Sequence, residues 1–261
     1  MVNRKLWPYA NVLLLLVTLI VNGLANGLPL NGQTTASISD KFPVLFVPAG
    51  YVFAIWGLIY IGLIAFGVFQ ALPGQRASIR LSRIDPLFAT SCALNATWIF
   101  MWHYNLFPLS LAVMVGLLLC LIGIYLRLDI GRTPVGAVER WMQNIPFSIY
   151  LGWITVATIA NTSDVLYYFG WNGQPFGPEI WFVVVLVAAV AIASAVALTR
   201  GDIAYMLVIL WAFVGIAVKQ AAIQTVAYTT WAFTVVVAVM LVVGWWLNRR
   251  RTTALMQVRA G

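Results

Sequence analysis

Residues 107–126 read FPLSLAVMVGLLLCLIGIYL, a run of apolar side chains that contains no charged residue. Its length is close to the ~20 residues that an α-helix needs to cross the ~30 Å hydrocarbon core of a bilayer. Similar runs recur near residues 10–29, 49–71, 86–104, 145–161, 179–198, 203–221 and 228–247. Backbone polar groups inside a bilayer must be satisfied within the protein, and the alternating pattern of a transmembrane barrel is absent. The predicted fold is therefore all-α, a bundle of about eight transmembrane helices.

The composition supports a membrane location for most of the chain. Of the 261 residues, 62% are hydrophobic and only 8% are charged. A soluble domain of this size carries about 25% charged residues, because its surface must meet water. The chain has too few polar side chains to cover a water-soluble globule. We expect a multi-pass integral membrane protein whose partners include membrane lipids.

The net charge of +8 is distributed unevenly about the predicted spans. With an even number of spans, both termini lie on one side, and thirteen of the 15 basic residues lie there too. They are Arg4, Lys5, Arg76, Arg80, Arg83, Arg127, Arg132, Arg140, Arg200, Arg249, Arg250, Arg251 and Arg259. The other side has only Lys41 and Lys219. The positive-inside rule then predicts cytoplasmic termini, in a plasma membrane such as the bacterial inner membrane. The sequence has no basic stripe interleaved with exposed aromatics, the pattern typical of nucleic-acid binding, so no nucleic-acid partner is expected.

Three of the predicted spans place aromatic and amide side chains on one helix face. The sets are Phe53, Trp56 and Tyr60; Asn95, Trp98 and Trp102; and Tyr150, Trp153, Ala157 and Asn161, all at helical spacing. At ~1.5 Å per residue, Trp56, Trp98 and Trp153 lie roughly 9–12 Å below the outer ends of their helices. These patterns fit an aromatic-lined cavity, but they also fit ordinary packing or a lipid-facing aromatic belt. Asn95, in the same layer, needs a hydrogen-bond partner from a neighbouring helix or from a ligand.

The same three spans carry motifs of a known family. Residues 48–60, PAGYVFAIWGLIY, are similar to Pro-Pro-x-Trp-x-Phe-Gly-Pro-Val-Trp-x-x-Leu-Tyr. Residues 93–98, ALNATW, are close to Ala-Leu-Asn-x-x-Trp. Residues 150–161, YLGWITVATIAN, resemble Tyr-Leu-x-Trp-x-x-Phe-Ala-x-x-Leu-Asn. In this order and spacing the motifs resemble the tryptophan-rich sensory protein family, also called the TspO or translocator-protein family.

The chain departs from the family pattern at several positions. Tyr51 replaces the usual first tryptophan of the second span, and Val156 stands where a phenylalanine is usual. No Lys or Arg follows the tyrosines after Asn161, so the cholesterol-recognition pattern of animal members is missing. The family core has five spans, which implies a TspO-like core over residues 1–165. Residues 166–261 would then form a three-helix transmembrane extension with a short basic tail.

The resemblance implies a binding or sensory protein, often a homodimer, that holds porphyrins, heme or sterol-like lipids in a pocket capped by the first loop. Carried over by position, with the two aromatic wall residues added, the expected ligand-binding residues are Phe53, Trp56, Tyr60, Asn95, Trp98, Tyr150, Trp153, Ala157 and Asn161. No cofactor is required on this reading, since porphyrin or heme would be the ligand. The sequence leaves three alternatives open: a transporter of such ligands, a light-dependent porphyrin-degrading enzyme, and a structural partner subunit.

Two features outside the motifs also lead to structural predictions. The polar segment 30–47 is long enough to fold over the bundle as a lid. Ala189, Ala193 and Ala197 recur every four residues, which is typical of close helix packing.

Single polar residues are expected to have ordinary roles. His103, the only histidine, is expected at the membrane interface, and one histidine excludes a multi-histidine metal site. Lys219 is expected to extend to the lipid headgroups. Asp85 is expected to cap the third span, and Asp164 to be solvated at the outer surface.

Overall fold

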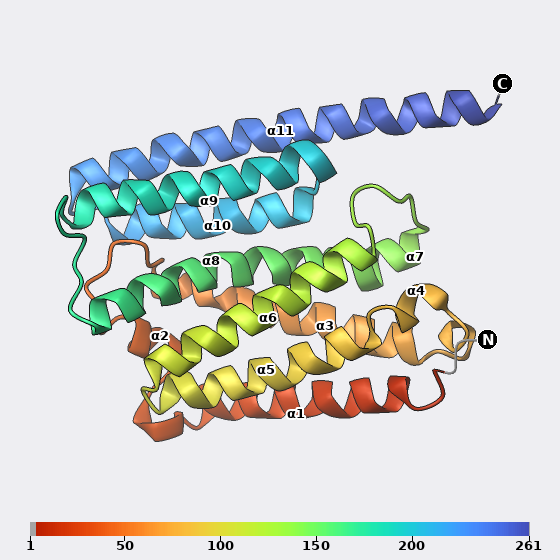
Figure 1. Ribbon diagram of the computed structural model, residues 1–261, viewed down its shortest axis with the longest axis horizontal. Coiled ribbons are helices and arrows are strands. Elements are labelled where there is room, and N and C mark those ends of the chain that lie inside the picture. The colour runs from red at the N-terminus through yellow and green to blue at the C-terminus, as the bar shows by residue number, and fades with distance from the viewer. Residues whose placement is uncertain (1–3, 261) are drawn as a thin grey trace.

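The computed structural model describes residues 4–260, with side chains described for residues 4–250. Eight long helices lie side by side in one elongated bundle (Figure 1). They are α1 (Trp7–Gly27), α3 (Ile55–Ala71), α5 (Asp85–His103), α6 (Phe107–Arg127), α8 (Ile145–Tyr168), α9 (Pro178–Arg200), α10 (Ile203–Lys219) and α11 (Gln224–Ala260). Short helical segments connect them: η1 (Leu30–Gly32), α2 (Thr35–Ser39), η2 (Gly50–Ala54), η3 (Pro73–Gln75), α4 (Ile79–Ser82), α7 (Ala137–Glu139) and η4 (Arg140–Asn144). No strand occurs in the described chain, so the all-α prediction is confirmed.

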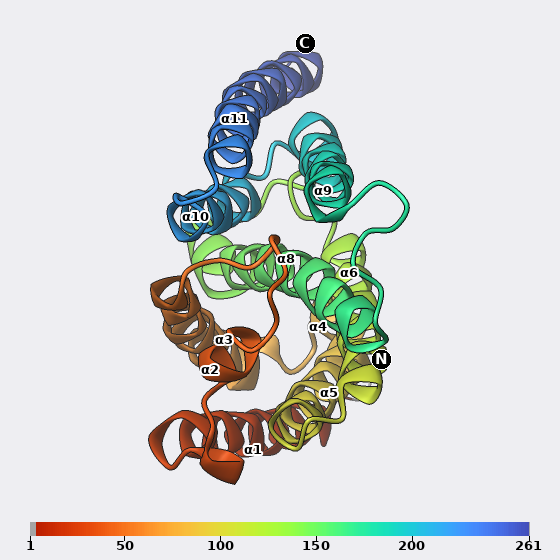
Figure 2. The ribbon, with the colours of Figure 1, turned by 90° about the vertical axis from the view of Figure 1, so that its left-hand side faces the viewer.

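Helix α8 lies at the centre of the bundle (Figure 2). On one side it packs against α3 and α6, which with α1 and α5 complete a five-helix group. On the other side it packs against α10, and α11 covers α9 and α10. One helix thus forms a wall shared by the first five long helices and the last three. The division of the chain near residue 166 stays a prediction.

Six helices of the described chain are long and apolar enough to cross a membrane. They include α1, α6, α9 and α11, together with α3 and α8 as extended by the short helices before them. Helices α5 and α10 occupy the other two predicted ranges, but α10 has only 17 residues and α5 is not among the six. Large apolar side chains are exposed along these helices, as expected for surfaces in contact with lipid. A multi-pass fold is therefore supported, and the count of eight spans stays a prediction.

The two ends of the chain lie at the same end of the bundle, on the right of Figure 1. That end also holds the carboxyl ends of α3, α6 and α9 and the amino ends of α5, α8 and α10. The arginine-rich connections are there, whereas Lys41 and Lys219 lie at the opposite end. We call these the basic end and the lid end. Their placement relative to the cytoplasm stays a prediction.

Proline and glycine fix where several helices begin and end. A proline occupies the first turn of five long helices, at Pro8, Pro86, Pro108, Pro146 and Pro178. Its fixed φ suits that turn, where the missing N–H would be unpaired in any case. Helix α9 ends at Gly201, which adopts a left-handed conformation with φ 60°. Asp202 follows and caps α10 by accepting a hydrogen bond from the Tyr205 amide at 3.2 Å.

Small residues bring α9 and α11 into close contact. Ala189, Ala193 and Ala197 are all buried, as the four-residue repeat predicted. A Cβ atom added at Gly244 of α11 would lie 2.4 Å from the carbonyl oxygen of Ala197. Because backbone cannot move aside as a flexible side chain can, the two helices approach this closely only with glycine at residue 244.

Replacing Gly244 with alanine is therefore expected to destabilise the protein, despite the better helix propensity of alanine. Overpacking of this kind costs about 1–3 kcal/mol, which should lower the thermal unfolding midpoint in detergent. Gly23→Ala in α1 is the matched control, since nothing lies within 4 Å of the Cβ it would add. An unchanged midpoint for Gly244→Ala would contradict the packing of α9 on α11.

Candidate functional site

Three tryptophans from three helices meet near the lid end of the five-helix group. The rings of Trp56 (α3) and Trp98 (α5) stack with centroids 6.4 Å apart. Trp153 (α8) meets Trp56 edge to face at 6.2 Å. All three side chains are buried. The rings therefore point into the bundle and not toward lipid.

Further aromatic side chains extend this layer on both sides. Phe53 packs edge to face on Trp153 at 5.7 Å, and Trp102 stacks on Trp98 at 5.5 Å. Tyr60 stacks on Trp56 at 5.6 Å, on the side away from the lid end. Offset and edge-to-face arrangements are the preferred geometries of aromatic pairs. The three predicted stripes thus form one continuous aromatic cluster.

Next to this cluster, a chain of hydrogen bonds joins four helices. The Tyr60 hydroxyl donates to Asn22 Oδ1 at 2.6 Å, and Asn22 Nδ2 donates to Asn95 Oδ1 at 2.7 Å. Asn95 Nδ2 then donates to the Tyr150 hydroxyl at 2.8 Å. The buried amide of Asn95 therefore finds its partners on neighbouring helices. This chain holds α1, α3, α5 and α8 in register by polar contacts inside an apolar bundle.

The aromatic cluster surrounds a small cavity, which we call the aromatic chamber. Its lining residues are Thr35, Ser39, Pro48, Phe53, Trp56, Trp98, Trp102, Trp153, Val156, Ala157, Ala160, Asn161 and Asp164. Six of the nine predicted ligand-binding residues are among them, whereas Tyr60, Asn95 and Tyr150 are not. The chamber has a volume of about 40 Å³. Ligand sites of drug size measure about 300–1,000 Å³, so the chamber is too small for such a ligand in this arrangement.

The segment from η1 to Pro48, which contains α2, covers the chamber and forms its lid. The side-chain amides of Asn31 and Gln33 both donate to the His103 carbonyl at 3.0 Å. Trp102 Nε1 donates to the Thr35 carbonyl at 3.2 Å, and Phe42 packs against Trp102. The lid is thus attached to the carboxyl end of α5 by three hydrogen bonds and one aromatic contact.

Two polar atoms on chamber-lining residues lack a hydrogen-bond partner among the described residues. They are Trp153 Nε1 and Asp164 Oδ1. The prediction that Asp164 is solvated is wrong, because only 1% of this residue is exposed. Helix α8 continues to Tyr168, beyond the predicted end at residue 161, and this carries Asp164 inside the bundle. A buried donor and a buried acceptor without partners are costly, which makes them candidate contacts for a bound molecule.

His103 and Lys219 also differ from their expected roles. His103 lies at the end of α5 as predicted, but its ring is fully buried and Nδ1 contacts the Ile99 carbonyl at 2.8 Å. Lys219 forms an ion pair with Asp40 of the lid and does not simply extend to headgroups. No group of three or more potential metal ligands occurs in the described part of the chain.

At the basic end, Asp85 has a different role from the predicted helix cap. It lies in the first turn of α5, and its carboxylate pairs with the guanidinium of Arg4 at 2.5 and 2.6 Å. Asn11 Nδ2 also donates to this carboxylate at 3.0 Å. Sequence reasoning treated Arg4 only as a topology signal, because nothing in the sequence indicates a contact between residues 81 positions apart.

The profile of the TSPO-like protein family matches residues 8–243 of the sequence. This match extends from α1 through α10 and into α11, so it includes the three helices that follow the aromatic core. No curated protein and no solved structure matches the chain. Three motif-bearing helices that meet in one aromatic cluster agree with the family match, and the apolar helices make this a multi-pass membrane protein. The chain belongs to the TSPO-like protein family.

Proposed function

We propose that the aromatic chamber binds a flat, mostly apolar ligand of the porphyrin, heme or sterol-like class. The observation that carries this proposal is the meeting of Trp56, Trp98 and Trp153 beside two unpartnered polar atoms under a lid. Indole rings offer flat apolar surfaces on which a planar ring system stacks. Burial of the ligand's faces supplies most of the affinity, at roughly 25 cal/mol per Å² of apolar surface.

The unpartnered atoms favour a ligand that is apolar on its faces and polar at one edge. Trp153 Nε1 is a donor, and the Asp164 carboxyl can accept a hydrogen bond. A tetrapyrrole, whose nitrogen atoms and carboxylate side chains include both donors and acceptors, has this chemistry. A sterol has a single hydroxyl, which can donate and accept but cannot contact both of two residues that lie eleven positions apart on α8, a helical rise of about 16 Å. The pair of atoms therefore favours the tetrapyrrole within the proposed class.

Ligand binding on this proposal requires the lid to move. A volume of 40 Å³ is close to the space that one water molecule occupies. Thr35 and Ser39 of α2 line the chamber, so displacing the lid is the change that enlarges it most directly. The lid's contacts are hydrogen bonds, one ion pair and aromatic packing, all of which can break and reform. We infer that ligand uptake is coupled to opening of the lid.

The test is a titration of the purified full-length protein with protoporphyrin, followed by quenching of tryptophan fluorescence. Trp153→Phe keeps a ring in place but removes Nε1, and Asp164→Leu removes both acceptor oxygens at similar side-chain size. Each is expected to weaken binding about tenfold, since a lost hydrogen bond in a buried site costs about 1–3 kcal/mol. Trp231→Phe, on the exposed face of α11, is the matched control and should bind like the parent.

Absence of quenching in the parent, or equal affinity in Trp153→Phe and the parent, would contradict the proposal that the chamber is the ligand-binding site. Illumination of the bound complex then distinguishes binding from chemistry. Unchanged porphyrin after illumination agrees with a binding or transport role, whereas new pigment products would favour the light-dependent enzyme.

A further inference from the structure

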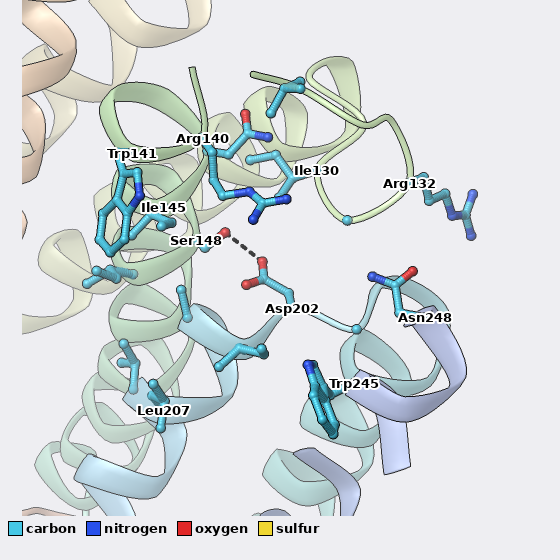
Figure 3. Close-up of a pocket in the computed structure, with 18 of the residues that line it drawn as sticks. Ile130, Arg132, Arg140, Trp141, Ile145, Ser148, Asp202, Leu207, Trp245 and Asn248 are labelled. Atoms are coloured by element: carbon cyan, nitrogen blue, oxygen red, sulfur yellow. Dashed lines mark hydrogen bonds between the residues drawn. The ribbon is translucent and has the colours of Figure 1, made fainter. Parts of the chain in front are cut away.

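A second and much larger hollow lies at the basic end, between α8, α10 and the connection that follows α6 (Figure 3). Its volume is about 1,150 Å³. Residues of α8, α10, the connection between α6 and α7, the start of α3, and the stretch 245–249 of α11 line it. It shares no lining residue with the aromatic chamber. We call it the basic groove.

The inner part of the basic groove is apolar. Leu58 of α3, Ile149 of α8 and Leu207 of α10 line its walls, and Trp211 lies at its inner end. The Trp211 ring is fixed there, because its Nε1 donates to the Val52 carbonyl at 3.1 Å. Nine residues separate Asp202 from Trp211 along the chain, a helical rise of about 13 Å. This length suits an extended hydrocarbon chain that lies along α8 and α10.

The mouth of the basic groove is positively charged. Arg132, Arg140 and Arg249 line it, and Figure 3 shows the Arg140 side chain directed into the hollow. Within the described residues, neither Arg132 nor Arg140 takes part in an ion pair. The Arg249 guanidinium lies 4.6 Å from the ring of Trp245, a second lining residue. Arg132 lies at the outer rim with its side chain directed away from the hollow, so Arg140 is the guanidinium placed to contact a phosphate in the mouth, and Arg132 and Arg249 add positive charge around it.

Two further polar residues of the basic groove differ in their hydrogen bonding. Asp202 is satisfied: it accepts from the Ser148 hydroxyl at 2.6 Å and from Tyr125 at 2.9 Å (Figure 3 shows the first of these bonds). Burial raises the pKa of this carboxyl, although its hydrogen bonds act in the opposite direction. Asn144 is not satisfied, because its Oδ1 lacks a partner among the described residues while only 7% of the residue is exposed. The groove thus presents an unused acceptor next to its cationic mouth.

From these features we propose that the basic groove binds an anionic phospholipid. The phosphate contacts Arg140 in the mouth, Arg132 and Arg249 supply further positive charge at its rim, and Asn144 Oδ1 accepts a hydrogen bond from a headgroup hydroxyl. One acyl chain extends along α8 and α10 toward Trp211. The headgroup that satisfies both contacts combines a negative charge with hydroxyl donors, as the glycerol headgroup of phosphatidylglycerol does.

The position of the basic groove favours a membrane lipid over a soluble phosphate compound. Its walls are apolar helices of the bundle, and its mouth lies at the basic end, where the arginine-rich connections are expected to meet lipid headgroups. A soluble phosphate compound would contact only the mouth and leave the apolar inner part without an occupant. A lipid occupies both parts at once, which matches the division of the groove into a charged and an apolar section.

The headgroup contact is tested by native mass spectrometry of the full-length protein with equal amounts of phosphatidylglycerol and phosphatidylcholine. We expect the parent to retain phosphatidylglycerol with a preference of about tenfold. The double variant Arg132→Gln, Arg140→Gln should lose most of that preference. The control, Arg76→Gln with Arg83→Gln, removes two exposed arginines from the same end outside the groove and should retain it. No preference in the parent, or an equal loss in both variants, would overturn the proposal.

The contact between the lipid acyl chain and the groove is tested separately. Ala204→Trp fills the groove between α10 and α8, whereas Ala188→Trp adds the same ring on the exposed face of α9. Only Ala204→Trp should reduce the number of retained lipids, and cross-links from a photoreactive acyl chain should map to α8 and α10. Unchanged retention in Ala204→Trp would exclude the groove as the site. Displacement of the lipid by an equal concentration of soluble glycerol phosphate would show that the headgroup alone is recognised, which also contradicts the proposal.

Discussion

Replacing Arg4 with alanine is expected to destabilise the protein by about 3–5 kcal/mol, the cost of leaving one partner of a buried ion pair without its counter-charge. The side chains of Arg4 and Asp85 are 0% and 1% exposed, and two N–H···O bonds join them. Arg4 also donates to the Gln75 carbonyl at 2.7 Å, which ties the start of the chain to the connection between α3 and α5. The measurement is the unfolding midpoint in detergent.

The effect of Arg4→Ala comes mainly from the carboxylate that stays behind. Asp85 is fixed in the first turn of α5 next to Pro86, so it cannot move to water. Adding Asp85→Asn to Arg4→Ala removes that stranded charge and is expected to recover part of the lost stability. Arg76→Ala, at an exposed position of the same end, should cost less than about 0.5 kcal/mol. Equal midpoints for Arg4→Ala and Arg76→Ala would show that the buried pair contributes no stability.

The aromatic cluster could be predicted from the sequence because helical periodicity and the family motifs point to the same residues. Periodicity predicted Trp56, Trp98 and Trp153 at one depth and left inward and lipid-facing orientations open, whereas the family resemblance implied a shared pocket. Their rings do meet inside the bundle. That they bind a ligand stays a prediction. The hydrogen-bonded partner of Asn95 was not predictable, since Asn22 lies on another helix and belongs to no motif.

The size of the chamber and the burial of Asp164 could not be inferred from the sequence. Periodicity gives the direction of a side chain but not the space left between five converging rings and a lid. The end of α8 was expected at Asn161, but the helix continues to Tyr168, whose neighbour Tyr167 packs against Phe42 of the lid, a long-range contact that the sequence does not reveal. The basic groove was missed for a related reason. Its arginines were counted only as topology signals, and its walls come from segments as distant as α3 and α11.

Replacing Phe42 with alanine is expected to accelerate porphyrin uptake about 30-fold. The Phe42 ring is the aromatic contact of the lid with α5, α6 and α8, at 4.9 Å from Phe107, 6.3 Å from Trp102 and 6.4 Å from Tyr167. Truncating a buried phenylalanine costs about 3–5 kcal/mol. If about 2 kcal/mol of this cost falls on the docked lid, the population with an open lid rises about 30-fold. Stopped-flow quenching of tryptophan fluorescence by protoporphyrin measures the change.

A general loss of stability must be separated from loosening of the lid, and Phe88→Ala makes that separation. Phe88 is buried between Phe66 and Phe147 at the basic end, at 4.8 and 5.9 Å, and does not contact the lid. The Phe88→Ala variant should have a lower unfolding midpoint, as Phe42→Ala should, but its rate of porphyrin uptake should equal that of the parent. Because the lid covers the aromatic chamber, only a substitution that loosens the lid should alter the rate of porphyrin binding. Equal rates in the parent and Phe42→Ala would mean that the ligand reaches the tryptophans by another route, or does not reach them.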